Sequence, residues 1–333
     1  MSQKMFKAFV AAEGKDNTFV REIKERSLDE LPQGDVLVKV KYSSINYKDA
    51  LSSTGNRGVT KKYPHTPGID AAGIVEESSS SDFAAGEEVI VTSYDLGMNT
   101  SGGLGQYIRV PADWVVKKPA NLSLRESMIF GTAGFTAALS LYKLFGSGIK
   151  PGDGPVLVSG ATGGVGSIAV SILAKLKYEV AAVNGIVDEK DYLLKLGAKT
   201  VVSIQDATDT SNRPLLKGLW AGAIDTLGGP ILATTLKSML YGATVTCCGN
   251  AGSPDLPTNV YPFILRGVTL IGIDSQNCPM PTRQKVWEKI STDWKLDNLD
   301  ALTTEISLEG VDDRIQMILQ GKHKGRTLVR LPD

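Results

Sequence analysis

The sequence predicts an α/β protein in which a β-rich domain is joined to a doubly wound parallel sheet. Three observations favour this class. Residues 156–184 read as strand, small-residue turn, helix and strand, which is a βαβ unit. Strand and helix patterns then alternate to about residue 274, as is typical of a parallel sheet covered by helices. Residues 1–120 instead hold short strand patterns punctuated by Pro and Gly, which indicates a partly open barrel or sandwich.

The N-terminal strands are expected wherever apolar residues alternate or form short runs. Residues 35–42 show this well, because Val36, Val38 and Val40 fall on one face. By the same criteria we expect strands at 5–11, 19–23, 68–75, 87–92 and 106–110. Ser123 followed three residues later by Glu126 predicts a helix start, and helical apolar spacing continues over residues 133–144.

The second half of the chain alternates between the two kinds of element. We expect strands at 156–158, 180–183, 200–204, 223–227, 243–247 and 268–273, and helices from 165, at 188–196 and at 230–240. Two further helices are expected at 282–293 and 309–320, and a last strand at 326–331 that returns to the N-terminal domain. The predicted domains are therefore 1–125 completed by 275–333, with residues 126–274 inserted as a nucleotide-binding domain.

The turn after the first buried strand carries the strongest functional signal. Ala161, Gly163 and Gly166 occupy the three positions of the G-x-G-x-x-G pattern, with Gly164 and Val165 between the last two. Small residues there let the backbone approach a pyrophosphate and let the helix pack closely on the strand. The helix N-terminus then offers N–H groups to the phosphates. A turn without a ligand is the alternative, but the strand–turn–helix context favours dinucleotide binding.

The end of the second strand favours NADPH as the dinucleotide. NAD sites place an Asp or Glu about 20 residues beyond the glycines to hold the ribose 2′-hydroxyl. Here 184 − 163 = 21 residues on from Gly163 stands Asn184, followed by Gly185. A neutral turn can admit a 2′-phosphate that a carboxylate would repel. The open alternative is an NADH site that lacks its acidic residue.

Composition excludes several kinds of partner. Lys and Arg number 36, equal to Asp and Glu, which argues against nucleic acid or an anionic membrane as a main partner. The three cysteines imply no disulfide framework, and the first residues show no signal-like apolar core. No run approaches the ~18 apolar residues of a membrane span. We therefore expect a cytoplasmic protein.

Five motifs carry a family resemblance. They are NYKD at 46–49, PGID at 67–70, GTAGFTA at 131–137, ATGGVG at 161–166 and GRT at 325–327. With them the chain resembles the medium-chain dehydrogenase/reductase superfamily along essentially its whole length. It looks most like the zinc-free quinone oxidoreductase branch, and within that branch like the bacterial NADPH-dependent acrylyl-CoA reductases. Motifs specific to that subgroup stand at 44–51, 131–137, 220–226 and 262–266. The resemblance implies a GroES-like domain, a Rossmann domain and a homodimer.

The departures from zinc-dependent relatives predict that no metal is bound. Those relatives place a Cys where Asn46 stands and Gly-His-Glu where Gly68, Ile69 and Asp70 stand. Zinc needs three or four N, S or O side-chain ligands. The chain has only two histidines, and the four-cysteine structural loop of the relatives is missing. We therefore expect catalysis without a Lewis acid.

The resemblance also suggests site residues. Tyr47 is the candidate hydrogen-bond donor or acid, with an aromatic wall as the alternative, and Asn46 is a candidate to hold the substrate or the cofactor ribose. Arg326 is either a cation for the cofactor or the partner of an acid. Arg57, Lys61 and Lys62 could meet the phosphates of a CoA substrate or form a solvated basic loop. Further expected cofactor contacts, taken from family position and strand ends, are Thr132, Ile204, Gly249, Asn250, Ala251, Phe263, Ile264 and Ser275.

Three functions follow from this site. The first is reduction of an activated C=C by hydride from NADPH, with a short enoyl-CoA such as acrylyl-CoA as substrate. Its enzymatic alternative is an NADPH-dependent quinone or enone reductase. A catalytically silent NADPH-binding protein is the third hypothesis, and a blocked site would be its mark.

Overall fold

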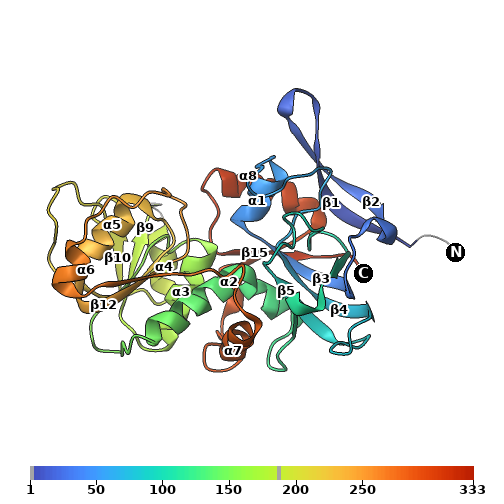
Figure 1. Cartoon of the computed structure of the whole chain (residues 1–333). Helices are drawn as coiled ribbons and strands as arrows, with labels where there is room; N and C mark the ends of the chain where they lie inside the picture. Colours follow the sequence, from blue (N-terminus) through green and yellow to red (C-terminus); the bar gives the residue numbers. More distant parts are fainter. Residues whose placement is uncertain (1–3, 186–188) are drawn as a thin grey trace. The chain divides into compact units, whose positions relative to one another are not determined.

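Two compact units make up the chain, and the computed structural model describes residues 4–185 and 189–333 of it (Figure 1). Unit 1 consists of Met1–Thr132, Ser275–Ser291 and Asn298–Asp333, and unit 2 of Ala133–Asp274 and Thr292–Asp297. The first division thus falls at 132/133 rather than at the predicted 125/126. It lies inside helix α2 (Leu124–Phe145), because the first turns of this helix pack with unit 1.

Unit 1 is β-rich, as the sequence predicts. Its larger sheet has the strand order β14 (Thr303–Ser307), β15 (Arg326–Arg330), β3 (Val36–Ile45), β4 (Asp70–Ser78), β5 (Glu88–Thr92) and β7 (Val115–Lys117), with β6 (Tyr107–Val110) paired to β3. A separate antiparallel hairpin consists of β1 (Met5–Glu13) and β2 (Phe19–Ser27), and it is drawn in blue in Figure 1. The helices of unit 1 are α1 (Tyr47–Ser53), α7 (Met280–Ser291) and α8 (Val311–Leu319).

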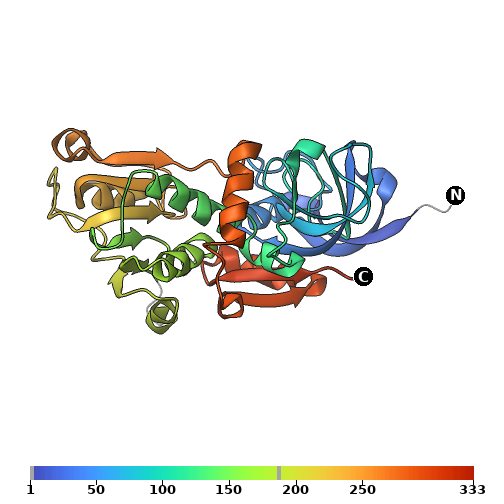
Figure 2. The same ribbon diagram turned by 90° about the horizontal axis from the view of Figure 1, so that it is seen from below.

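The last strand of the chain lies within the larger sheet of unit 1, between β14 and β3. β15 pairs antiparallel with β3 and parallel with β14, which confirms the predicted return of the chain to the N-terminal domain. Figure 2 shows β14 and β15 side by side in red. Val36, Val38 and Val40 are buried on one face of β3, as their alternation predicts, and α8 packs on the same core through Val311 and Ile315.

Unit 2 is a six-stranded, wholly parallel sheet. Its order is β10 (Thr200–Ser203), β9 (Val180–Asn184), β8 (Val156–Val158), β11 (Trp220–Asp225), β12 (Met239–Cys247) and β13 (Thr269–Gly272). The helices are α3 (Gly164–Lys175), α4 (Lys190–Lys195), α5 (Gly229–Lys237) and α6 (Tyr261–Arg266). This is the 3-2-1-4-5-6 order of a dinucleotide-binding fold. The predicted fold class is therefore confirmed.

Helix α2 begins with the predicted capping box. The Ser123 N–H donates to Glu126 Oε2 at 2.8 Å and the Glu126 N–H donates to Ser123 Oγ at 3.1 Å. By length and composition α2 could cross a membrane, although the sequence shows no long apolar run. However, 78% of its most apolar window is buried inside the fold, as is typical of a core helix.

Some elements differ from those predicted. The sequence analysis missed α1, α6, β7 and β14, which are short and lack a clear apolar period. The predicted helix over 188–196 begins at Asp188, which lies outside the described residues, and α4 as described starts at Lys190.

Candidate functional site

The start of α1 is fixed by a buried carboxylate. Asn46 is the N-cap of the helix, and its backbone N–H donates to Asp49 Oδ2 at 2.7 Å. The other oxygen, Asp49 Oδ1, accepts from the backbone N–H groups of Gly68 at 3.0 Å and Ile69 at 2.9 Å. Asp49 therefore ties the first turn of α1 to the loop that leads into β4.

Burial determines the acidity of Asp49. Loss of hydration and the neighbouring charge of Asp70 raise the pKa of Asp49 to about 7, although the three backbone N–H groups lower it. The two carboxyl groups thus lie in one buried environment, and the proton affinity of Asp49 depends on the charge of Asp70.

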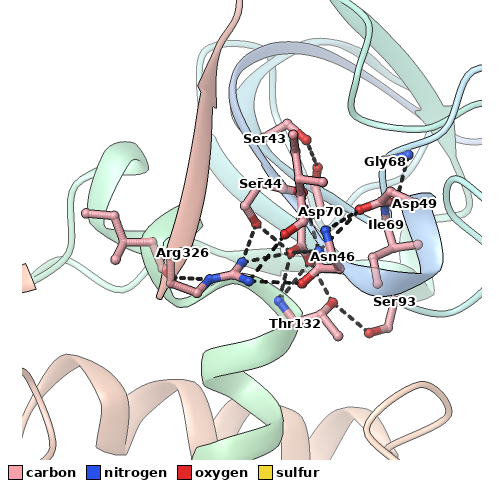
Figure 3. A network of polar contacts seen from close by, with 12 residues as sticks. Ser43, Ser44, Asn46, Asp49, Gly68, Ile69, Asp70, Ser93, Thr132 and Arg326 are labelled. Atoms are coloured by element: carbon pink, nitrogen blue, oxygen red, sulfur yellow. Dashed lines mark hydrogen bonds and ion pairs between the residues drawn. The ribbon is translucent and has the colours of Figure 1, made fainter. Parts of the chain in front are cut away.

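Asp70 lies at the centre of a polar network (Figure 3). Its Oδ2 accepts from Ser44 Oγ at 2.6 Å and from Asn46 Nδ2 at 2.7 Å. Its Oδ1 accepts from the backbone N–H of Thr132 at 2.8 Å and from Thr132 Oγ1 at 2.6 Å. The side chain is fully buried, so these donors replace the water that the carboxylate loses on folding.

Arg326 completes the network from β15. Its Nη2 donates to Ser44 Oγ at 2.7 Å, its Nη1 donates to Asn46 Oδ1 at 3.1 Å, and its Nε donates to the Ile129 carbonyl at 2.9 Å. Nη2 also lies 3.6 Å from Asp70 Oδ2 as an ion pair. Burial lowers the pKa of the guanidinium, while the two buried aspartates raise it. The charges thus compensate each other inside the unit.

These contacts decide between roles that the sequence left open. Arg326 is only 2% exposed, so its burial favours the pairing with an acid over the expected cofactor contact. The Asn46 side chain uses its oxygen for Arg326 and its amide for Asp70 and the Ser44 carbonyl. Asn46 therefore belongs to the buried network, and its expected contact with the substrate or the cofactor ribose stays a prediction.

Thr132 enters the network because the helix breaks just before it. Gly131 interrupts α2 with φ 51° and ψ −156°, which turns the Thr132 N–H toward Asp70. The Thr132 hydroxyl donates to Asp70, so it accepts from Ser93 Oγ at 2.9 Å. Ser93 and Tyr94 both have positive φ, at 65° and 50°. Non-Gly residues with such values cluster at functional sites.

Tyr47 and Lys48 differ from their inward-pointing neighbours. Tyr47 is 53% exposed, as the prediction of a hydrogen-bond donor requires, and that role stays a prediction. Lys48 is half-buried, and its Nζ donates to Gln276 Oε1. The first turn of α1 thus has two side chains in the buried network and two outside it.

A buried arginine holds the segment around Ser275, an expected cofactor contact. Arg283 on α7 is fully buried and donates to the carbonyls of Ser275 at 3.0 Å and Gln276 at 3.1 Å. It also donates to Thr92 O at 3.1 Å and stacks over the Tyr94 ring at 4.3 Å. The backbone at Ser275 is therefore fixed against the end of β5.

In unit 2 the glycine turn has the geometry that its pattern predicts. Gly163 is the N-cap of α3, so the free N–H groups of this helix follow it directly. A Cβ on Gly166 would lie 2.3 Å from the Gly160 carbonyl oxygen, so only Gly allows this packing. The turn follows β8, which neighbours β11 at the point where the strand order reverses, and ligands bind there in such sheets.

The remaining expected cofactor contacts of unit 2 vary in their surroundings. Asn184 is the last residue of β9 and pairs with Ser203, the last residue of β10. Ile204, which follows Ser203, is exposed and lies next to Gly185. Residues 249–251 follow β12 at the same edge of the sheet, and the Ala251 N–H donates to the Thr226 carbonyl. Phe263 is partly buried against the core of unit 2, whereas Ile264 is exposed, and the cofactor contacts of both stay predictions.

Of the three basic residues that could bind the phosphates of CoA, one already has partners within the protein. Arg57 pairs with Glu13, donates to the Lys61 carbonyl at 2.8 Å and lies over the Tyr63 ring. Lys61 and Lys62 are exposed. These contacts favour the solvated basic loop.

The residues at the former metal position do not fit zinc. Asn46 donates its amide to Asp70, and Ile69 offers no ligand atom. Over residues 4–185 and 189–333, no group of three or more His, Cys, Asp or Glu residues could hold a metal ion. A hydrogen-bonded network fills the position instead.

Sequence reasoning missed several members of this site. Asp70 was noted only as a departure from the zinc ligands, and Ser44 only within a motif. Ser93, Gln276 and Arg283 gave no sequence signal, because Ser, Gln and Arg are ordinary surface residues until their burial is known.

Comparison with known proteins agrees with the fold. Residues 32–120 match the alcohol dehydrogenase GroES-like domain, and residues 164–292 match the zinc-binding dehydrogenase family. YhfP of Bacillus subtilis, provisionally named a quinone oxidoreductase, is 48% identical over 98% of this chain and 99% of its own. Acrylyl-CoA reductase AcuI of Ruegeria pomeroyi is 46% identical over 92% of this chain and 93% of its own.

Solved structures are similar over the whole chain. The YhdH oxidoreductase of Salmonella enterica in complex with NADP has a TM-score of 0.95 at 44% identity, covering 98% of this chain and 100% of that one. YhfP with NAD bound also has a TM-score of 0.95, at 47% identity and the same coverage. The chain belongs to the medium-chain dehydrogenase/reductase superfamily. Within it, the chain falls in the zinc-free branch together with YhfP and AcuI.

Proposed function

We propose that this chain is a zinc-independent oxidoreductase that transfers hydride from NADPH to an activated C=C, with a short enoyl-CoA such as acrylyl-CoA as substrate. The observation that carries the proposal is the network of Asn46, Asp70 and Arg326 at the position where zinc-dependent relatives bind their metal. A site without a Lewis acid suits a substrate that is already activated by conjugation to a carbonyl. The identity to AcuI supports the enoyl-CoA substrate.

The dinucleotide fits unit 2. The N-terminus of α3 offers N–H groups for the pyrophosphate, and the neutral pair Asn184 and Gly185 leaves room for a 2′-phosphate. NADP in the YhdH structure supports this assignment, whereas NAD in the YhfP structure supports the alternative. Bound NADPH would supply the hydride.

The residues of unit 1 would stabilise the charge that develops on the substrate and keep Tyr47 in position. Tyr47 is the exposed donor for the carbonyl oxygen, where negative charge develops when hydride reaches the β-carbon. The buried network holds the first turn of α1 and residue Thr132 in place, so that Tyr47 does not have to be ordered during the reaction.

A quinone or enone reductase is the second candidate, because YhfP carries that provisional name at 48% identity. The test is an NADPH-oxidation assay that compares acrylyl-CoA with a simple quinone, repeated with NADH. A higher kcat/KM for acrylyl-CoA with NADPH is the expected result. Preference for the quinone would favour the second candidate. Tight NADPH binding without turnover of any activated alkene or quinone would favour a silent binding protein.

We also propose a cytoplasmic homodimer. β13 is the edge strand of the unit 2 sheet, and Tyr241, Ile264 and Leu265 expose apolar surface near it, at 85%, 66% and 56% exposure. An edge strand beside apolar surface is suited to pairing with a second copy. Sedimentation of the wild type and of Ile264→Glu tests this, and a monomeric wild type would contradict it.

A further inference from the structure

The first turn of α1 divides its four side chains between two environments. Asn46 and Asp49 are used inside unit 1, where their polar atoms bond to Arg326, Asp70 and the backbone of the loop before β4. Tyr47 and Lys48 are the two that remain outside this network. Tyr47, which is exposed, and Lys48, which is half-buried, are therefore the side chains of this segment that are left for a substrate contact.

Lys48 is held in a defined position rather than being extended into solvent. It is half-buried, and its Nζ donates to the side-chain oxygen of Gln276, which is a neutral acceptor. Gln276 in turn is fixed through its carbonyl, which accepts from the Tyr94 N–H at 3.2 Å and from Arg283 Nη2 at 3.1 Å. The position of the Lys48 ammonium group is therefore set by a side chain that is itself held in place.

The supporting residues link Lys48 to the rest of the site. Arg283 joins the segment 275–276 to Thr92, at the end of β5. Directly after it, Ser93 donates to Thr132, the hydroxyl of which donates to Asp70. One buried arginine thus sets both the position of Gln276 and the end of the chain of hydroxyl groups that reaches Asp70.

We propose that Lys48 is a catalytic residue of the reduction and is the acid that delivers the proton to the α-carbon. The inference rests on the proposed function and assigns the proton donor that the enoyl reduction requires. Tyr47 keeps the hydrogen bond to the carbonyl oxygen, and Lys48 completes the reaction at carbon. Gln276 is the positioning residue that orients the ammonium.

The step balances as follows. Hydride from NADPH, the reductant, forms a C–H bond at the β-carbon, and the electron pair of the C=C moves toward the carbonyl as an enolate. The enolate pair then forms the α-carbon C–H bond with a proton from the Lys48 ammonium. The N–H bond breaks, its electron pair stays on nitrogen, and the neutral amine takes a proton from solvent. The products are the saturated thioester and NADP⁺.

The choice between proton donation and simple charge can be tested, because arginine keeps the charge but cannot be deprotonated. The variants are Lys48→Met, Lys48→Arg and Gln276→Ala, with Lys24→Met on the exposed strand β2 as the matched control. The assays are kcat and KM with acrylyl-CoA and with a quinone, and the NADPH Kd from fluorescence titration. Reduction of acrylyl-CoA in D₂O then shows whether deuterium enters one or both faces of the α-carbon.

The expected result is a kcat for acrylyl-CoA lower by about 10²-fold in both Lys48 variants, the usual contribution of a general acid. Deuterium should enter one face in the wild type and both faces in the Lys48 variants. Gln276→Ala should lower kcat less, and Lys24→Met should not change it. The NADPH Kd and the quinone kcat should stay within about threefold of the wild type, since a hydroquinone takes its protons on oxygen from water.

Other outcomes overturn the proposal. Recovery of kcat and of one-face deuteration in Lys48→Arg would show that Lys48 acts only by its charge. A weaker NADPH Kd with unchanged kcat would make Lys48 a cofactor ligand, and equal losses with both substrates would make its role structural. A wild type without enoyl-CoA turnover would remove the proposed function itself, whereas an active wild type with an unchanged Lys48→Met kcat would remove only the role of Lys48.

Discussion

Gly131 allows the sharpest test of the buried network. A Cβ at this position would lie 2.4 Å from Asp70 Oδ2, 2.6 Å from Ser44 Oγ and 2.8 Å from Arg326 Nη2. All three neighbours are buried and hydrogen-bonded to one another, so none can move without breaking the network. Gly131 also has φ 51°, where a side chain is strained in any surroundings. Gly131→Ala should therefore destabilise unit 1 in two ways.

The two costs can be separated with matched variants. Gly86 of unit 1 has φ +90° and open space at its Cβ, so Gly86→Ala measures backbone strain alone, at ~1–2 kcal/mol. Gly272 has neither a positive φ nor a neighbour, and Gly272→Ala should change little. In Gly131→Ala, overpacking adds a further ~1–3 kcal/mol to the strain. The total loss is then about 3 kcal/mol.

Thermal unfolding measures this difference. For units of 150–250 residues, 1 kcal/mol shifts Tm by roughly 2–4 °C. We expect Tm to fall by roughly 3–5 °C in Gly86→Ala and by about 10 °C in Gly131→Ala, on these constants. A Gly131→Ala protein that melts together with Gly86→Ala would refute the reasoning, because the network would then absorb a methyl group without cost.

Three further predictions concern the same two regions. Arg326→Met should cost ~3–5 kcal/mol in urea unfolding because it leaves Asp70 as an uncompensated buried charge; the double variant with Asp70→Asn should recover part of that loss, and additive losses would contradict the pairing. Asn184→Asp should lower the ratio of kcat/KM with NADPH to kcat/KM with NADH by tenfold or more, because the new carboxylate repels the 2′-phosphate and ~1.4 kcal/mol of binding energy corresponds to tenfold. An unchanged ratio would show that this turn does not select the cofactor. Burial and Asp70 raise the folded-state pKa of Asp49 from 3.8 to about 7, so the folded protein keeps a proton that the unfolded chain releases. The stability that Asp49 contributes is complete below its unfolded-state pKa of 3.8 and is lost as the pH rises to its folded-state pKa of about 7. The urea midpoint of the wild type should therefore fall over this pH range, and that of Asp49→Asn should fall less. Equal pH dependence in the two proteins would exclude this role of Asp49.

Much of the fold could be predicted from the sequence because its signals are local. The βαβ unit of β8, α3 and β9 follows from apolar period and glycine spacing alone, and the end of the chain could be assigned to the N-terminal domain. Helix α1 could not be predicted, because seven residues carry too little periodicity and its start depends on Asp49 reaching the loop before β4.

The site could be predicted only where a residue type implies its use. The close packing at Gly166 follows from the glycine pattern, and the structure admits no side chain there, while its contact with the cofactor stays a prediction. For Arg326 the sequence left two roles open, and only the structure shows its pairing with Asp70, since a sequence does not show which atoms of a polar side chain are already bonded. Arg283 was missed because most of its hydrogen-bond partners are backbone carbonyls, which every residue has.

The pairing of β15 with β3 also sets the order in which the chain can mature during synthesis. The last segment of unit 2 ends at Asp297, so this nucleotide-binding unit has all its residues before translation is complete. Unit 1 must wait for Arg326 and the strand that carries it, although its first strands are made before those of unit 2. Until the ribosome releases that strand, the carboxylate of Asp70 has no cation beside it, and the nascent GroES-like half stays open along the exposed edge of β3.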